Sequence, residues 1–248
     1  MNRKYVWLFF AVFAGLSILF AAGKPVNLLA QEDKKLDIPV LEYESEIRKD
    51  VTGERKAKSA HFNGRGNPDR SKRIAELPQG VEVLPSTSHW WIGLSALPVT
   101  SSDMIVLGEI IDAAAHFSDD RTGIYSEFSI GVSDYFKDTT ESLSVGKTIS
   151  ANRIGGGVKF ASGKIQQYRL GRQGMPIKGT RYLLFLRREE GGDLTILTGY
   201  ALLHGRVIPL DGEDNPDPRS ALPFSRYKGA EESQLLQDLL KEIQGGAK

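Results

Sequence analysis

A histidine and two aspartates near the middle of the chain are the side chains best suited to acid–base or metal chemistry. His116 is followed by Asp119 and Asp120 in a polar stretch that ends at Gly123. An imidazole beside carboxylates can transfer protons or bind a transition metal. Aspartate also caps turns through nearby backbone groups, so this spacing is equally typical of a connector between two strands. The other histidines are far apart in the sequence (His61, His89 and His204). We therefore predict no catalytic residue and no metal site.

Three further stretches resemble cofactor or nucleophile motifs but lack essential positions. Residues 144–148 end in Gly-Lys-Thr, yet Glu141 stands where a phosphate loop requires glycine. Ser95 lies in Gly-Leu-Ser-Ala-Leu, without the second glycine of a nucleophile elbow. Residues 211–217 are rich in carboxylates but lack the glycine and distal glutamate of an EF-hand loop. These departures predict that the chain uses no cofactor.

Two tryptophans and a group of basic residues are the candidates for binding. Trp90 and Trp91 are adjacent, so in a strand one would point to the core and the other to solvent. The basic residues fall within a later, glycine-rich stretch (Arg153, Lys159, Lys164, Arg169 and Arg172). We take Trp90, Trp91, Arg153 and Arg172 as candidate binding residues. The alternatives are core packing for the tryptophans and a solvated rim for the basic residues.

The overall composition limits the classes of partner. The chain has 248 residues, no cysteine and a formal net charge of +1. Disulfides, thiolate metal sites and cysteine nucleophiles are therefore excluded. A net charge this small gives no long-range attraction to nucleic acid, so we expect no nucleic-acid partner.

The first 30 residues have the layout of an export signal or a membrane anchor. Arg3 and Lys4 precede an uncharged, apolar run over residues 5–22. The run is long for a signal-peptide core and sufficient for one membrane span, so both possibilities stay open. Either one predicts a location outside the cytoplasm: periplasmic, secreted or anchored to the inner membrane of a bacterial envelope.

Residues 31–87 are predicted to form a flexible, charged linker. They contain few large apolar residues in any period, and Gly64-Arg65-Gly66-Asn67-Pro68 is a turn signal. Acidic residues dominate before Asp50 and basic residues from Val51 to Arg73. A solvated spacer explains this tract, and contact with an anionic lipid or polymer is the alternative.

Residues 88–212 are predicted to fold as an all-β domain. Residues 124–136 alternate between apolar and polar side chains, and the continuous apolar run 181–187 indicates a strand buried on both faces. Gly108 interrupts the first strand at a position suited to a sharp bend. The other expected strands follow from shorter apolar runs bounded by turn residues (104–113, 148–154, 158–160, 164–168, 194–198, 201–203 and 206–210).

The C-terminal region, residues 213–248, is predicted to be a loop followed by an amphipathic helix. Its leucines and isoleucine recur at helical spacing (Leu235, Leu236, Leu239, Leu240 and Ile243). Glu231 and Glu232 suit its first turn, and Gly245-Gly246 ends it. We expect this stripe to pack on the barrel.

The order of these strands resembles a small Greek-key barrel of the OB type. Three phrases resemble the netrin-like modules and tissue inhibitors of metalloproteinases: Ser102–Ile110, Phe128–Val132 and Gly179–Leu186. Residues 88–212 are also similar to uncharacterised exported proteins of environmental bacteria. The inhibitors grip zinc through an N-terminal cysteine, which this chain lacks, so the resemblance implies the fold and not that activity.

The sequence therefore predicts a non-catalytic binding or interaction module outside the cytoplasm. Its expected partner is an envelope protein or polymer, and residues 5–22 would hold it to the membrane if they are retained. The alternative is an enzyme or enzyme inhibitor that uses the loop 116–123 or the insertion 155–172.

Overall fold

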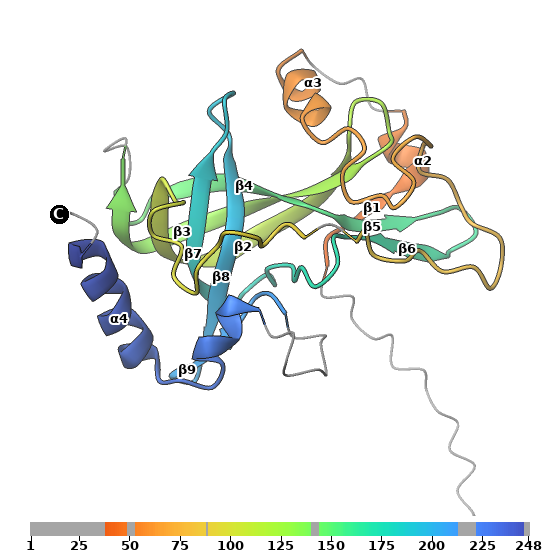
Figure 1. The fold of residues 1–248 in the computed structure, drawn as a ribbon. Helices are drawn as coiled ribbons and strands as arrows, with labels where there is room; N and C mark the ends of the chain where they lie inside the picture. Colours follow the sequence, from red (N-terminus) through yellow and green to blue (C-terminus); the bar gives the residue numbers. More distant parts are fainter. Residues whose placement is uncertain (1–37, 49–52, 88, 140–143, 213–221, 246–248) are drawn as a thin grey trace, which may run out of the picture. The chain divides into compact units, whose positions relative to one another are not determined.

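The computed structural model describes residues 38–48, 53–87, 89–139, 144–212 and 222–245. Within them the chain is mostly β-sheet with little helix, arranged as two sheets (Figure 1). The prediction of a β-rich fold is confirmed at this level. The predicted N-terminal export signal or anchor, residues 1–30, lies outside the described residues. Among the described residues, no helix is both long enough and apolar enough to cross a bilayer.

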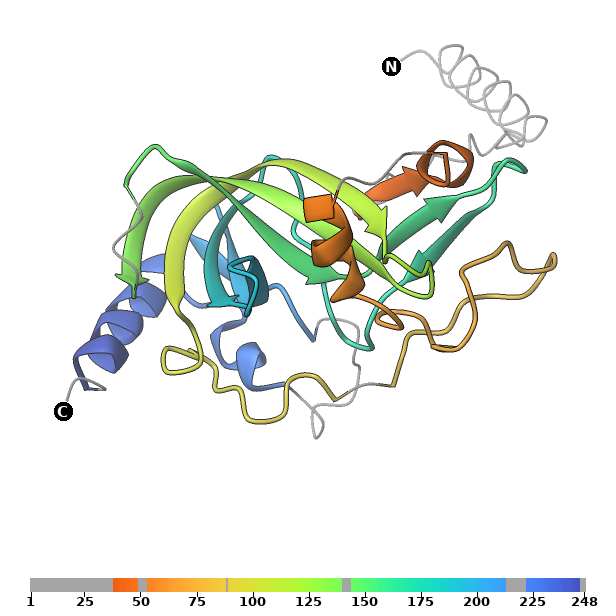
Figure 2. The same cartoon turned by 90° about the horizontal axis from the view of Figure 1, so that it is seen from above.

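The larger sheet has six strands in the order β4-β3-β2-β7-β8-β9. Their bounds are β2 (Met104–Phe117), β3 (Ile124–Asp138), β4 (Thr148–Ile154), β7 (Arg181–Arg188), β8 (Leu194–Leu203) and β9 (Arg206–Pro209). β4 also pairs in parallel with β8 at Ala151–Leu194 and Asn152–Thr195. This pairing joins strands from opposite parts of the sheet and makes it partly ring-like (Figures 1 and 2).

The first two strands of this sheet are long and irregularly paired. β2 runs four residues beyond the predicted end, so His116 and Phe117 belong to a strand and not to a loop. The register between β2 and β3 shifts between Leu107 and Gly108. A Cβ at Gly108 would lie 2.7 Å from the carbonyl oxygen of Gly131, so the glycine permits a close approach of the two backbones. The sharp bend that the glycine predicts stays a prediction, and the register shift is what the strand pairing records at this position.

The strand β7 is buried on both faces, as its continuous apolar run predicts. Residues 182–186 are all buried, and the strand pairs with β2 on one side and β8 on the other. β8 is one strand where the sequence suggested two, because Gly199 and Tyr200 stay within the ladder.

The smaller sheet corrects the boundary of the predicted linker. It has the order β1-β5-β6, with β1 (Val40–Glu42), β5 (Gly156–Lys159) and β6 (Ile165–Tyr168). The hairpin of β5 and β6 is the predicted one, but β1 comes from the stretch expected to be a spacer. Two helices lie in the same stretch: α2 (Tyr43–Glu46) and α3 (Gly53–Ala60).

The remainder of that stretch also packs against the sheets. Its large apolar residues are isolated in the sequence, but Leu41, Phe62 and Ile74 are each at most 4% exposed. Ser86 forms a parallel bridge with Leu170. Residues 38–87 are therefore largely part of the folded unit, because single apolar anchors and backbone pairing hold a segment that has no periodic pattern.

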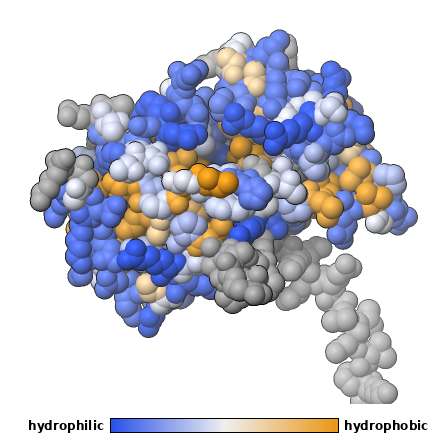
Figure 3. Space-filling model, viewed as in Figure 1, coloured by the Kyte–Doolittle hydropathy of each residue, from blue (hydrophilic) through white to orange (hydrophobic). Residues whose placement is uncertain are grey.

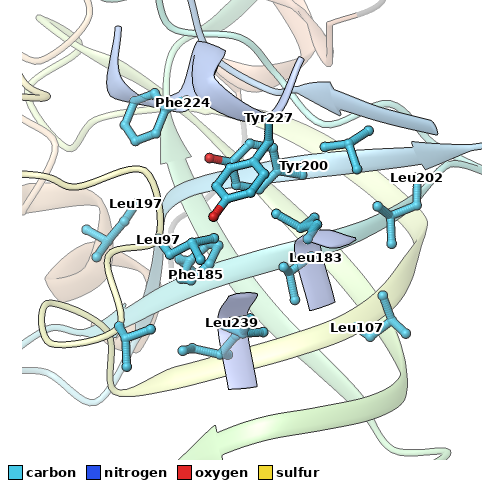
Figure 4. Packing of buried hydrophobic residues seen from close by; sticks show 14 of the residues in the cluster. Leu97, Leu107, Leu183, Phe185, Leu197, Tyr200, Leu202, Phe224, Tyr227 and Leu239 are labelled. Atoms are coloured by element: carbon cyan, nitrogen blue, oxygen red, sulfur yellow. The ribbon is translucent and has the colours of Figure 1, made fainter. Parts of the chain in front are cut away.

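The C-terminal helix packs on the larger sheet, whereas residues 213–221 of the predicted loop lie outside the described part of the chain. After the 3₁₀ helix η2 (Pro223–Tyr227), α4 (Glu232–Gly245) places Leu235 and Leu239 in a cluster of buried hydrophobic residues from β2, β7 and β8 (Figure 4). Leu236 and Ile243 are partly buried against this cluster, whereas Leu240 is 45% exposed. The buried stripe is therefore narrower than the sequence pattern.

Candidate functional site

The helix α3 lies outside both sheets and is fastened to them mainly by charged side chains. Of its described side chains only Ser59 is buried, so the helix contributes almost no apolar surface to the core. The surface around α3 is largely hydrophilic (Figure 3). A helix of eight residues is too short to be stable alone, so its position depends on the contacts described below.

The segment after α3 is locked to the turn between β2 and β3. Phe62 is 2% exposed, and its ring stacks on Tyr125 with centroids 4.2 Å apart. The backbone of Ile124 donates a hydrogen bond to the carbonyl of Arg65, and Gly64 donates one to the hydroxyl of Thr122. A Cβ at residue 123 would lie 2.1 Å from the Phe62 carbonyl oxygen, so the fit requires Gly123.

A groove of about 990 Å³ lies between α3, the strands β3 and β4, and the turn from β7 to β8. We call it the α3 groove. Its lining residues are Arg55, Ala57, Lys58, His61, Phe62, Glu127, Asn152, Glu189, Glu190, Gly191 and Asp193. The basic members come from α3 and the residue just after it, and the acidic members come from the strands and the turn. This volume is at the upper end of the range for small-molecule sites.

Lys58 bridges the two sides of the α3 groove. Its Nζ lies 2.7 Å from Oε2 of Glu127 and 3.4 Å from Oδ1 of Asp193. The Lys58 side chain is 17% exposed. Burial acts to raise the pKa of Glu127, but the hydrogen bond and charge of Lys58 outweigh it and hold that pKa below its ordinary value. Glu127 and Asp193 therefore form a binding site for one ammonium group, which we call the seat.

A second bridge crosses the groove at His61. Its Nε2 is 3.7 Å from Oε2 of Glu189, and Oε1 of the same carboxylate accepts a hydrogen bond from Arg187 at 3.0 Å. Burial acts to raise the pKa of Glu189, and the hydrogen bond from Arg187 more than offsets it, so the net shift is downward. Ionised carboxylates therefore line the wall of the groove opposite α3.

One residue that lines the α3 groove, Asn152, carries a hydrogen-bond acceptor without a partner. Asn152 on β4 is 1% exposed, and its Oδ1 has no hydrogen-bond partner among the described residues. A buried amide oxygen without a partner costs about 1–3 kcal/mol. Because Oδ1 is buried, a ligand N–H or O–H can gain this hydrogen bond only if the Asn152 side chain turns toward the groove.

His116 is the most buried histidine but is already engaged. Its Nε2 lies 3.3 Å from Nη2 of Arg55, and its Nδ1 lies 3.3 Å from Oε1 of Glu46. Arginine only donates, so Nε2 is the acceptor in the contact with Arg55, and Nδ1 faces the carboxylate of Glu46. Burial raises the pKa of the neighbouring Tyr125 to about 12. Both ring nitrogens of His116 thus fasten α2 and α3 to β2.

The contact between α3 and the sheet is expected to weaken in acid. Because the folded-state pKa of Glu127 is depressed, its stabilising effect is present above the ordinary value of 4.5 and is lost as pH falls through the lower, folded-state pKa. At pH 7, Glu127→Gln should speed amide exchange in residues 53–60 about two- to fivefold, the range for a partly exposed ion pair. Below the folded-state pKa, wild type and variant should exchange alike.

Asp112→Asn is the matched control, because Asp112 pairs with Lys178 at 2.8 Å and lies outside the α3 groove. Exchange rates would be measured by mass spectrometry and corrected for the intrinsic pH dependence. Equal rates for Glu127→Gln and wild type at pH 7 would contradict the role assigned to this carboxylate.

Neither family models nor curated proteins nor solved structures match this chain.

The four candidate binding residues do come together, but in a packed cluster. Trp90 and Trp91 lie in a turn, both are partly buried, and both pack against the same core as α4. The guanidinium of Arg153 lies 5.6 Å from the Trp90 ring centre, and that of Arg172 lies 5.3 Å from the Trp91 ring centre. The alternative of core packing accounts for both tryptophans, since neither is exposed.

The expectation that Arg153 is part of a solvated rim is wrong. Its side chain is 0% exposed and pairs with the equally buried Asp211. Its Nε donates to the carbonyl of Gly174 at 2.8 Å, and its Nη1 donates to the carbonyl of Ile196 at 3.2 Å. Burial raises the pKa of Asp211, and the Arg153 guanidinium opposes that shift. Arg153 is therefore part of a buried ion pair and is not a binding residue.

The remaining predicted groups also have structural roles. Lys159 pairs with Glu42 at 2.9 Å, and Lys164 donates to three backbone carbonyls of the segment 77–81. Asp120 accepts hydrogen bonds from the hydroxyls of Ser118 and Thr122, as a turn-capping aspartate does. Within the described residues, no three potential ligands from histidine, aspartate and glutamate are close enough to hold a metal ion.

Proposed function

We propose that this chain is a non-catalytic binding module that acts outside the cytoplasm, and that its ligand occupies the α3 groove. The observation that carries the proposal is the buried, unpartnered Oδ1 of Asn152 in the wall of a groove of about 990 Å³. The ligand would be an envelope protein or polymer that supplies a hydrogen-bond donor at this point.

The strand pairing supports a more specific proposal about the fold, namely that the larger sheet is an OB-like barrel. β2, β3 and β4 form an antiparallel meander, β7 and β8 extend it on the other side of β2, and β4 meets β8. OB barrels bind ligands on the face of their second and third strands and in the loops that join strands one to two and four to five. In this chain those strands would be β3 and β4, and the second loop would be the turn 189–193. Both contribute to the α3 groove.

An enzyme or inhibitor that uses the loop 116–123 or the insertion 155–172 has less support. His116 has Arg55 and Glu46 on its two ring nitrogens, Asp120 caps its own turn, and the insertion is a hairpin that pairs with β1. None of these groups directs a free base or nucleophile into the α3 groove.

The proposed site can be tested by photo-crosslinking with the full chain in living cells. A photoreactive residue at Glu190, which is exposed on the groove wall, should give covalent adducts. Asn152→Leu, which removes the unmet acceptor at similar volume, should reduce these adducts several-fold. The same photoreactive residue at Leu203, 40% exposed and away from the groove, is the control. Adducts that are insensitive to Asn152→Leu, or equally abundant from Leu203, would refute the site.

The proposed location needs a separate test. Cells that express the full chain would be fractionated, and the intact mass of the product measured. A soluble extracytoplasmic species that begins at Gly23 or Gln31 would indicate cleavage of an export signal. A membrane-bound species that retains Met1 would indicate an anchor. A product in the cytoplasm would contradict the proposed location.

A further inference from the structure

We propose that the carboxylate pair of Glu127 and Asp193 is a recognition site for the primary ammonium group of a basic peptide segment, and that Lys58 occupies this site until the ligand displaces it. The inference rests on the proposed function, because it names the ligand chemistry of the α3 groove. In this proposal Lys58 competes with the ligand for the carboxylate pair, and α3 is the tether that holds Lys58 near the site.

The seat itself is the first support. Lys58 Nζ is 2.7 Å from Glu127 and 3.4 Å from Asp193, and the two carboxylate side chains are only 31% and 39% exposed. A cation that contacts both of these partly buried carboxylates offsets their mutual repulsion. A ligand ammonium can replace that of Lys58 with no net change in the number of charge pairs, so the exchange does not leave buried charges unpaired.

The charge of the surrounding groove is the second support. The lining carries four carboxylates, on Glu127, Glu189, Glu190 and Asp193, against the permanent cations of Arg55 and Lys58. Displacement of Lys58 would increase this negative excess at the seat. A groove of this charge attracts a cationic ligand and disfavours a nucleic acid.

The third support is Oδ1 of Asn152, the hydrogen-bond acceptor without a partner among the residues that line the groove. Asn152 Oδ1 needs a donor, which a peptide N–H supplies and which Lys58 does not satisfy. The lining has one aromatic ring besides that of His61. This ring, of Phe62, is 2% exposed and is stacked on Tyr125. Single-stranded nucleic acids bind by stacking their bases on exposed aromatic rings, and apart from His61 the described lining of this groove presents none. A basic peptide therefore fits the groove better than an oligonucleotide.

The way in which α3 is held makes displacement feasible. Lys58, Arg55 and His61 link the helix region to the sheet through polar contacts, and Ser59 is its only buried residue among the described side chains. Phe62 and the following residues anchor the chain separately, at the turn between β2 and β3. The helix can therefore leave the seat without disturbing the core, and its tether keeps Lys58 at high effective concentration as a competitor.

The test is titration of the full chain with pentalysine at low ionic strength. Lys58→Gln should bind pentalysine about tenfold more tightly than wild type, since the tethered competitor is removed. Lys56→Gln is the matched control: Lys56 is an exposed residue of the same helix, and the two variants have the same net charge. Pentalysine acetylated on its side-chain amines is the matched ligand control, because it keeps the backbone and loses the ammonium groups.

The double variant Lys58→Gln/Glu127→Gln should lose most of the gain. Equal affinities of Lys58→Gln and Lys56→Gln, equal binding of acetylated pentalysine, or an undiminished gain in the double variant would overturn the inference. If Glu190 crosslinks still depend on Asn152 in that case, the groove is a site for another ligand class. If those crosslinks are absent as well, the proposed function fails together with the inference.

Discussion

Replacement of Arg153 by methionine is expected to destabilise the protein by about 3–5 kcal/mol, the cost of removing one partner of a buried ion pair. The substitution keeps most of the side-chain volume but removes the donors to the carbonyls of Gly174 and Ile196 and to Asp211. The carboxylate of Asp211 then stays buried with only the backbone N–H of Gly174 and the hydroxyl of Thr198. Urea unfolding, followed by tryptophan fluorescence, measures the loss.

Two further variants identify the cause of this loss. Arg153→Met/Asp211→Asn should recover part of the stability, since asparagine keeps an acceptor for Gly174 and carries no charge. Lys159→Ala removes a basic residue from the same part of the sequence, but its ion pair is 44% and 59% exposed, so the loss should stay within about 1 kcal/mol. A loss of less than 1 kcal/mol for Arg153→Met would contradict an internal role for Arg153.

Arg153 shows why the sequence could not distinguish a binding residue from a member of a buried ion pair. The residue lies in the predicted strand 148–154, among several basic residues, and nothing local distinguishes it from Lys159. Its carboxylate partner is 58 residues away in the sequence, at the start of the carboxylate-rich stretch 211–217, which resembles an EF-hand loop without its essential positions. The pairing of β4 with β8, and of β8 with β9, brings the two regions together.

The strands were predictable because their signals are local. Alternation over 124–136 and the apolar run over 181–187 each reflect the burial of one or both faces of a strand. The stretch 31–87 lacked such a signal, because its anchors are single apolar residues and parallel pairing of β1 with β5. Sequence periodicity detects regular elements and misses segments held at isolated points.

The α3 groove was not predictable for the same reason. Lys58 and Glu127 are 69 residues apart, and Lys58 lay in a charged tract whose composition is typical of a solvated spacer. The one sequence hint was the basic character of residues 51–73, which suggested contact with an anionic partner. In the structure, the anionic partner of Lys58 is the protein itself.

The helix α4 provides the second large effect, a loss of about 2–5 kcal/mol of stability for Leu239→Ala. Leu239 is 0% exposed in the cluster formed with β2, β7 and β8, and its truncation would leave a cavity that the surrounding strands cannot fill. The same unfolding measurement applies.

Leu240→Ala is the matched control on the same helix. Leu240 belongs to the hydrophobic stripe that the sequence predicts, yet it is 45% exposed, so its truncation should change stability by less than about 0.5 kcal/mol. Equal losses for the two leucines would mean that the whole stripe is covered, for instance by another molecule against α4. A large difference between the two losses would establish that the helix packs on the larger sheet through Leu235 and Leu239 and that Leu240 faces solvent. The reason is that the sheet contacts only a narrow strip of the helix surface.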